Sequence, residues 1–225
     1  MIRVATLYPD LLGTYGDGGN AVALVERTRR RGFEAELLEV TVDDQFVSAD
    51  VYLLGGGEDG PQRQAADLLR ASPFRRAYDE GAHVVAVCAG LQILGTTFAI
   101  EGDDEYEGLG LVDVTTTRGA KRSVGELATS VGDEILVGFE NHGGVTHLGE
   151  GVDPLGAILR GRGNDGRLDG YRAARVWATY AHGPVLAMNP WFADAVLASV
   201  LTCELEALPT VADQLHAQRR RALGL

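Results

Sequence analysis

The stretch His83–Gln92 reads HVVAVCAGLQ, an apolar strand-like run that passes directly into Cys88 and then into small residues and a helix-like segment. A sharp strand-to-helix elbow of this kind exposes the residue at its corner at the carboxyl edge of a sheet. The N-terminus of the following helix favours a thiolate there. We therefore interpret Cys88 as a candidate nucleophile. The alternative is a buried small hydrophobic residue, as many free cysteines are.

The segments around this elbow alternate between two patterns. Apolar strand-like runs occupy residues 2–7, 35–40, 51–54 and 83–87, and helix-like segments occupy residues 20–31, 62–70, 73–80 and 91–98. Such alternation indicates βαβ units. It predicts an α/β fold whose mostly parallel sheet is covered by helices on both faces.

The second half of the chain has a different pattern. Short strand-like runs are separated by Gly, Asp and Asn turns, at residues 108–117, 123–129, 134–139, 157–160 and 174–179. Two helices are expected after them, at residues 190–203 and 209–225. We expect one domain over residues 1–204 and a C-terminal helical tail over residues 205–225.

The composition excludes several classes of protein. The 225 residues include 20 Lys and Arg against 32 Asp and Glu, a net charge of −12, whereas nucleic-acid binding needs a basic surface. The two cysteines give neither a disulfide framework nor a CxxC pair, and we expect no metal site. No apolar run is long enough for a membrane span and the start does not resemble a signal peptide. We expect a cytoplasmic chain.

A nucleophilic thiol needs a base, and two histidines are candidates. His182 follows a strand-like run within YAHGP, so its ring is expected at the same sheet edge as Cys88. His142 lies in ENHGG, which we interpret as a glycine-rich turn. Either histidine could instead be a hydrogen-bonded turn residue. We expect a structural role for His83, a solvated position for His216 in the tail, and a place in the core for Cys203.

Acyl transfer also needs donors for an oxyanion. The run Gly55–Gly57 follows a buried strand and offers unobstructed N–H groups near Gly56, and Ala89 offers a second N–H next to the nucleophile. The run is not a phosphate-binding loop, because no Gly-Lys-Ser/Thr follows it. In the loop before residue 20, Asp17 and Asn20 can cap the first helix. They can equally line the pocket or a partner interface.

Together these motifs resemble a known family. GGGED at 55–59, VCAGLQ at 87–92 and AHGP at 181–184 are similar to class I glutamine amidotransferases, which have a flavodoxin-like fold. Within that class the cobyric-acid-synthase-like branch fits best. Four features resemble, more narrowly, the glutaminase subunits of lipid II isoglutaminyl synthase, the GatD subfamily. They are YGDGGN at 15–20, EGLGL at 107–111, GFENHGG at 138–144 and YAHGP at 180–184. The likeness covers about residues 4–201.

The resemblance implies a mechanism and site residues. Cys88 would attack the carboxamide of glutamine and His182 would transfer protons. Arg122 would bind the α-carboxylate, with Arg118 as runner-up and a solvated loop arginine as the alternative. It also implies contacts from Gln92, Asn141 and His142. Many class I members carry an acid two residues after the histidine, but here that residue is Pro184. We hypothesise that a partner subunit supplies the acid.

The resemblance also implies partners. A Mur-ligase-like MurT subunit, in a heterodimer, would bind ATP and Mg²⁺, and no cofactor is expected in this chain. The ammonia would amidate lipid II D-glutamate to D-isoglutamine in peptidoglycan synthesis, at the inner face of the membrane through partner and substrate. The alternatives are an amidotransferase subunit for a cobyrinate-type acceptor, a non-catalytic regulatory subunit, and a cysteine hydrolase of another amide.

Overall fold

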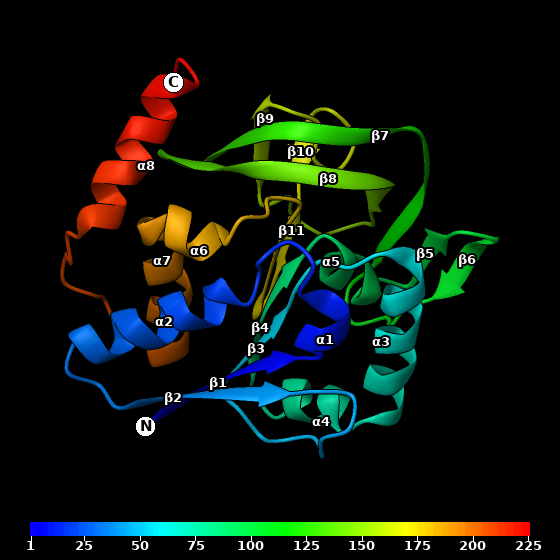
Figure 1. Cartoon of the computed structure of the whole chain (residues 1–225), viewed down its shortest axis with the longest axis horizontal. Coiled ribbons are helices and arrows are strands. Elements are labelled where there is room, and N and C mark those ends of the chain that lie inside the picture. The colour runs from blue at the N-terminus through cyan, green and yellow to red at the C-terminus, as the bar shows by residue number, and fades with distance from the viewer.

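The computed structural model describes the backbone of residues 1–225 and the side chains of all residues except 103 and 104. Its central sheet has six strands in the order β11-β12-β4-β3-β1-β2 (Figure 1). Five of them are parallel and β11 alone is antiparallel to its neighbour β12. The strands are β1 (Ile2–Leu7), β2 (Ala35–Val40), β3 (Val51–Leu54), β4 (His83–Val87), β11 (Tyr171–Ala173) and β12 (Val176–Thr179). The predicted mostly parallel α/β sheet is confirmed.

Helices cover both faces of this sheet. In Figure 1, α2 and α7 lie on one side of β1, β3 and β4, and α1, α3 and α5 lie on the other. This double cover explains why every residue of β3 and β4 is buried. The helices are α1 (Pro9–Leu12), α2 (Gly19–Arg30), α3 (Asp59–Ala71), α4 (Phe74–Asp79), α5 (Ala89–Ile93), α6 (Val185–Met188), α7 (Pro190–Leu201) and α8 (Val211–Ala222).

A second sheet lies over the carboxyl edge of the first. Its order is β10-β9-β7-β5-β6, with β8 paired to β7 (Figure 1). The strands are β5 (Thr97–Ile100), β6 (Asp103–Glu107), β7 (Val114–Val131), β8 (Glu134–Leu148), β9 (Gly156–Arg160) and β10 (Leu168–Asp169). The long hairpin β7–β8 places its middle portion beside the elbow at Cys88, where both contribute to one pocket.

Three expectations about the elements of this second sheet and its approach are wrong. The runs 108–117 and 123–129 are not two strands, because β7 continues through the segment between them with one irregularity in its register. ENHGG is not a turn, because it lies within β8 and all of its residues except Gly143 pair with β7. The helix expected over 91–98 ends at Ile93, and Thr97 and Phe98 belong to β5, which suits their β-branched and aromatic side chains.

The C-terminal helix α8 packs back on the hairpin. Thr210 and Asp213 form a capping box at its start. His216 is buried and contacts the carbonyl of Ile135 in β8 at 2.8 Å, so the expectation of a solvated His216 is wrong. Cys203, expected in the core, is exposed just after α7 ends at Leu201. In the described part of the chain, no helix is long and apolar enough to cross a membrane.

Candidate active site

Cys88 lies at the corner between β4 and α5, so the predicted strand-to-helix elbow is present. Its backbone angles, φ 51° and ψ −104°, are unusual for a residue with a side chain. Strain of this kind persists only where the surroundings fix it. The N–H of Cys88 donates to the carbonyl of Thr179, and the N–H of Gly90 donates to that of Gly55. A Cβ at Gly90 would lie 2.6 Å from Leu54, so only glycine lets α5 start this close to β3.

His182 follows β12 and is enclosed on several sides. Its Nδ1 lies 2.9 Å from Oδ2 of Asp17, while its Nε2 is buried with no hydrogen-bond partner among the described residues. The rings of Tyr15 and Phe139 pack against the imidazole at 4.5 and 5.4 Å between centroids. Burial lowers the pKa of His182, but interactions with the Asp17 carboxylate and the Cys88 thiol outweigh it and raise the pKa to about 9.

Asp17 fills the position that we expected a partner subunit to fill. Its side chain is buried, and Oδ2 accepts the N–H of Gly56 at 2.8 Å as well as that of His182. The hypothesis of an acid from a partner is therefore corrected: a carboxylate of this chain lies at Nδ1. Asp17 comes from the loop before α2 and makes no side-chain cap on that helix. Asn20, in turn, accepts the N–H of Leu186.

The glycine run after β3 has two separate functions. The N–H of Gly56 is engaged by Asp17, and a Cβ there would lie 2.4 Å from Cε1 of His182. Gly57, by contrast, lines the pocket that contains Cys88. Within the described residues, the N–H groups of Gly57 and Ala89 donate no hydrogen bond. This arrangement favours Gly57 over Gly56 as the partner of Ala89 in binding an oxyanion, which corrects our expectation for Gly56.

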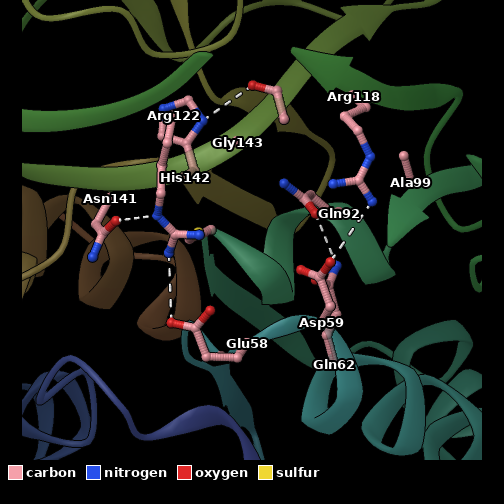
Figure 2. A pocket seen from close by; sticks show the side chains of 13 residues that line it. Glu58, Asp59, Gln62, Gln92, Ala99, Arg118, Arg122, Asn141, His142 and Gly143 are labelled. Carbon is pink, nitrogen blue, oxygen red and sulfur yellow. Dashed lines mark hydrogen bonds and ion pairs between the residues drawn. The ribbon is translucent and has the colours of Figure 1, made fainter. Parts of the chain in front are cut away.

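The pocket beside Cys88 has a charged mouth (Figure 2). Arg122, on β7, donates to Oδ1 of Asn141 at 2.6 Å and lies 3.5 Å from Oε1 of Glu58 across the mouth. Arg118, on the same strand, lies 3.8 Å from Oδ2 of Asp59. The structure thus brings both candidate arginines and Asn141 to the pocket, opposite two carboxylates. Its lining residues include Glu58, Asp59, Gln62, Cys88, Gln92, Arg118, Arg122, Asn141 and His142.

Tyr15 connects this mouth to His182. Its hydroxyl donates to Oε1 of Glu58 at 2.5 Å and accepts from Nη2 of Arg122 and Nδ2 of Asn141, both at 3.2 Å. Burial and the hydrogen bond to Glu58 raise the pKa of Tyr15 to about 12, so the hydroxyl keeps its proton at neutral pH. Sequence reasoning placed Tyr15 only within a family motif. The neighbouring Asp17 shares that motif, which was the available signal for both residues.

Gln92 belongs to the floor of the pocket. Its Oε1 accepts from Nε2 of Gln62 at 2.8 Å, and its Nε2 donates to the hydroxyl of Tyr180 at 2.9 Å. Tyr180 in turn contacts Oγ1 of Thr146 at 2.6 Å. Both ends of the Gln92 amide are therefore bonded to the protein, and the chain of bonds links α3, α5 and β8. Gln62 and Tyr180 were not predicted as site residues.

His142 also lies at the pocket, but it is not a second base for Cys88. Its Nε2 is 3.0 Å from Oε2 of Glu140, and its Nδ1 is 3.1 Å from the carbonyl oxygen of Gly144. The imidazole stacks on Tyr180 with 3.9 Å between ring centroids. Because both ring nitrogens are engaged inside the protein, neither is available to a substrate, which corrects the expected substrate contact of His142.

Comparisons with known proteins agree with this geometry. The family model of the CobB/CobQ-like glutamine amidotransferase domain matches residues 3–190. The chain is 31% identical over 207 residues to the lipid II isoglutaminyl synthase (glutamine-hydrolyzing) subunit GatD of Staphylococcus aureus, covering 89% of this chain and 84% of that one. The Streptococcus pneumoniae subunit GatD is 32% identical, with 89% and 80% covered. A cobyric acid synthase of Pelotomaculum thermopropionicum is 37% identical over 55% of this chain and 28% of its own.

Solved structures show the same fold. A chain of PurLQS from Thermotoga maritima has a TM-score of 0.61 at 18% identity, covering 90% of this chain and 99% of that chain. The crystal structure of a glutamine amidotransferase gives 0.60 at 21% identity, covering 88% and 98%. With the family model matched over most of its length, the chain belongs to the CobB/CobQ-like glutamine amidotransferase family.

Proposed function

We propose that this chain is a glutaminase subunit that hydrolyses L-glutamine to glutamate and ammonia through a thioester on Cys88. The observation that carries the proposal is the arrangement of Cys88, His182 and Asp17 at the carboxyl edge of the parallel sheet. The raised pKa of His182 favours an imidazolium beside a thiolate, which is the reactive form of a Cys–His pair.

The reaction follows in two halves. The Cys88 sulfur attacks the carboxamide carbon, and the N–H groups of Ala89 and Gly57 bind the oxyanion that forms. His182 then gives its proton to the leaving nitrogen, and the C–N bond breaks to release ammonia. In the second half His182 takes a proton from water, whose oxygen attacks the thioester and frees glutamate. Asp17 holds His182 in the tautomer that presents Nε2 to these steps.

Arg122 would select the amino-acid end of glutamine. Its guanidinium lines the pocket with Cys88, and its hydrogen bond to Asn141 fixes its orientation. A guanidinium pairs well with a carboxylate because two N–H groups can donate in parallel. Glutamine binding would exchange the exposed contact between Arg122 and Glu58 for a contact with the substrate α-carboxylate.

The ammonia would be delivered to a Mur-ligase-like MurT partner that binds ATP and Mg²⁺ and activates the acceptor carboxylate. The acceptor would be the D-glutamate of lipid II, amidated to D-isoglutamine by the complex in the cytoplasm, at the inner face of the membrane. The two GatD relatives support this assignment, because this chain spans at least 80% of their length. The cobyric acid synthase relative gives weaker support to a cobyrinate-type acceptor, because the match covers only 28% of the length of that synthase.

Glutamine turnover tests the first part of the proposal. Glutamate and ammonia release is measured for the chain alone and with its co-purified partner, using Cys88→Ser and the matched control Cys203→Ser. We expect Cys88→Ser to abolish turnover and Cys203→Ser, at an exposed site, to retain it. Absence of turnover and of Cys88 labelling by a glutamine-analogue electrophile, with partner present, would refute the proposal.

The partner and acceptor need a separate test. Co-purification from the native host is expected to recover a Mur-ligase-like protein, and the complex is expected to amidate lipid II with glutamine and ATP. Recovery of a cobyrinate-activating enzyme instead would redirect the proposal to the other acceptor.

A further inference from the structure

Two pairs of opposite charge lie across the mouth of the pocket, and the reaction above uses neither of their carboxylates. Arg122 lies 3.5 Å from Glu58 (Figure 2). Arg118 lies 3.8 Å from Asp59. All four side chains line the pocket that contains Cys88. Each arginine that could bind the α-carboxylate of the substrate therefore has an acidic side chain within 4 Å.

The amino-acid end of free glutamine carries two opposite charges on one carbon atom. An ammonium group has three donors and no acceptor, so in a partly enclosed pocket it needs acceptors of its own. Because Glu58 lies beside Arg122, a substrate whose carboxylate pairs with Arg122 brings its ammonium group close to Glu58. The acidic side chain repels a carboxylate and attracts an ammonium group, which favours this orientation over the reverse one.

Glu58 has one oxygen held by the protein and one oxygen free. Its contacts with the Tyr15 hydroxyl, at 2.5 Å, and with Nη2 of Arg122, at 3.5 Å, both reach Oε1. Within the described residues Oε2 accepts no hydrogen bond, and the side chain is 53% exposed. Asp59 differs, because its Oδ2 already accepts the backbone N–H of Glu101 at 2.6 Å. Glu58 is therefore the better candidate for a contact with the ammonium group.

The ammonium group would also replace the cation that Glu58 gives up. As proposed above, Arg122 would exchange its contact with Glu58 for one with the substrate α-carboxylate. Without a new cation, the Glu58 carboxylate would then lie unpaired beside the incoming carboxylate, which is unfavourable. The ammonium group of the same glutamine supplies that cation, so that one ion pair is replaced by two. Separation of the original pair costs little, because an exposed ion pair contributes little to stability.

We propose that Glu58 binds the α-ammonium group of glutamine and so restricts the substrate to amides with a free α-amino group. This inference rests on the proposed glutaminase function. The carboxamide at Cys88, the carboxylate at Arg122 and the ammonium group at Glu58 give three points of contact, enough to distinguish the two enantiomers of glutamine. Amides without a free α-amino group are expected to be poor substrates, because Glu58 is then left without a partner.

A substrate that lacks only the amino group tests the proposal. Glutaric acid monoamide keeps the carboxamide and the carboxylate of glutamine and has hydrogen in place of the amino group. Ammonia release from both compounds is measured for the complex with its co-purified partner, unsubstituted and with Glu58→Gln. We expect the unsubstituted complex to prefer L-glutamine about 10- to 100-fold in kcat/KM. Glu58→Gln should lower kcat/KM about 10-fold for L-glutamine and change it less than about 2-fold for the analogue.

The matched control is Glu80→Gln. Glu80 is 61% exposed and pairs with Arg76, but it is not among the residues that line the pocket. This variant should leave kcat/KM unchanged for both compounds. An equal loss with both compounds in Glu58→Gln would show that Glu58 only holds its neighbours in place, and would overturn this inference alone. A selective loss of L-glutamine turnover in Asp59→Asn, and not in Glu58→Gln, would also overturn it.

Direct binding covers the case in which Glu58→Gln fails to fold. In the complex with Cys88→Ser, titration calorimetry gives Kd for L-glutamine, D-glutamine and glutaric acid monoamide. We expect L-glutamine to bind about 10-fold or more tightly than the analogue, and the two enantiomers to differ. Equal Kd values for L-glutamine and the analogue would overturn this inference even where L-glutamine is turned over. Absence of glutamine turnover in the unsubstituted complex would instead overturn the proposed function, and this inference with it.

Discussion

The two sheets contribute to the pocket in different ways. The parallel sheet carries the proposed reacting groups at the ends of short buried strands, and Cys88 and His182 are only 5% and 0% exposed. The antiparallel hairpin supplies Arg122 and Asn141 from long strands, and the Arg122 side chain is 48% exposed. In the proposed mechanism, the reacting groups are therefore held rigidly by the core, whereas the groups that would bind the substrate are exposed side chains that can exchange hydrogen-bond partners.

The largest expected effect on turnover is at Cys88, which follows the end of β4. Replacing the Cys88 thiol with a hydroxyl by Cys88→Ser should reduce kcat by about 10³-fold or more, because the alcohol is a far weaker nucleophile. Steady-state ammonia release measures this. A loss of equal size in Cys203→Ser would show that folding, and not the nucleophile, had been affected.

Asp17→Asn should cause the next largest loss. The amide preserves the shape of the side chain but removes the charge, so the pKa of His182 should fall from its raised value and its tautomer is no longer fixed. We expect kcat to fall by about 10²- to 10⁴-fold, in line with the loss of the acid in other triads. The pH–rate profile should shift to lower pH together with the loss. An unchanged profile would contradict the role of Asp17.

Gly56→Ala tests how rigidly the core holds His182. The added methyl group would lie 2.4 Å from Cε1 of the imidazole, so the ring must shift from its present position. We expect kcat to fall by about 10²-fold, since small displacements of a catalytic group are costly. Gly60→Ala in α3, where a Cβ would meet nothing within 4 Å, is the matched control and should keep full activity.

On the exposed side, Arg122→Gln should change binding more than chemistry. Losing the guanidinium is expected to raise KM for glutamine by about 10-fold or more while kcat changes little, because a charge-assisted bond to the substrate carboxylate is removed. Arg167→Gln, an arginine that is 82% exposed and not among the residues lining the pocket, serves as the control. A fall in kcat with unchanged KM would contradict the proposal that the hairpin binds the substrate while the parallel sheet carries the reacting groups.

The smallest effect concerns stability. The pKa of His182 is about 9 in the folded chain, above its ordinary value of 6.5, so its protonation stabilises the fold. This contribution is fully present below pH 6.5 and is lost as pH rises through 9. Urea unfolding at pH 6.5 and at pH 9.5 should show lower stability at the higher pH, and Asp17→Asn should reduce that difference. Equal differences in both proteins would contradict it.

Local sequence was sufficient for the elbow at Cys88, because strand, turn and helix follow one another within ten residues. It was insufficient for Asp17, which meets His182 only after the chain has folded from its first loop to its last strand. ENHGG was misread as a turn because glycine favours turns, whereas it lies within β8, where Gly144 pairs with Arg118 of β7. The Glu140 carboxylate beside His142 accepts the N–H groups of Arg162 and Gly163, which no nearby pattern reveals.

The loop before α2 combines two tasks in three residues. Tyr15 contacts Glu58 and Arg122 at the mouth, and Asp17 holds His182 and the N–H of Gly56. In the proposed mechanism, substrate preference and the proton affinity of His182 are therefore not independent traits. A substitution at Tyr15 that favours a different amide substrate would also disturb His182. A substitution at Asp17 that alters the pKa of His182 would also alter the mouth of the pocket.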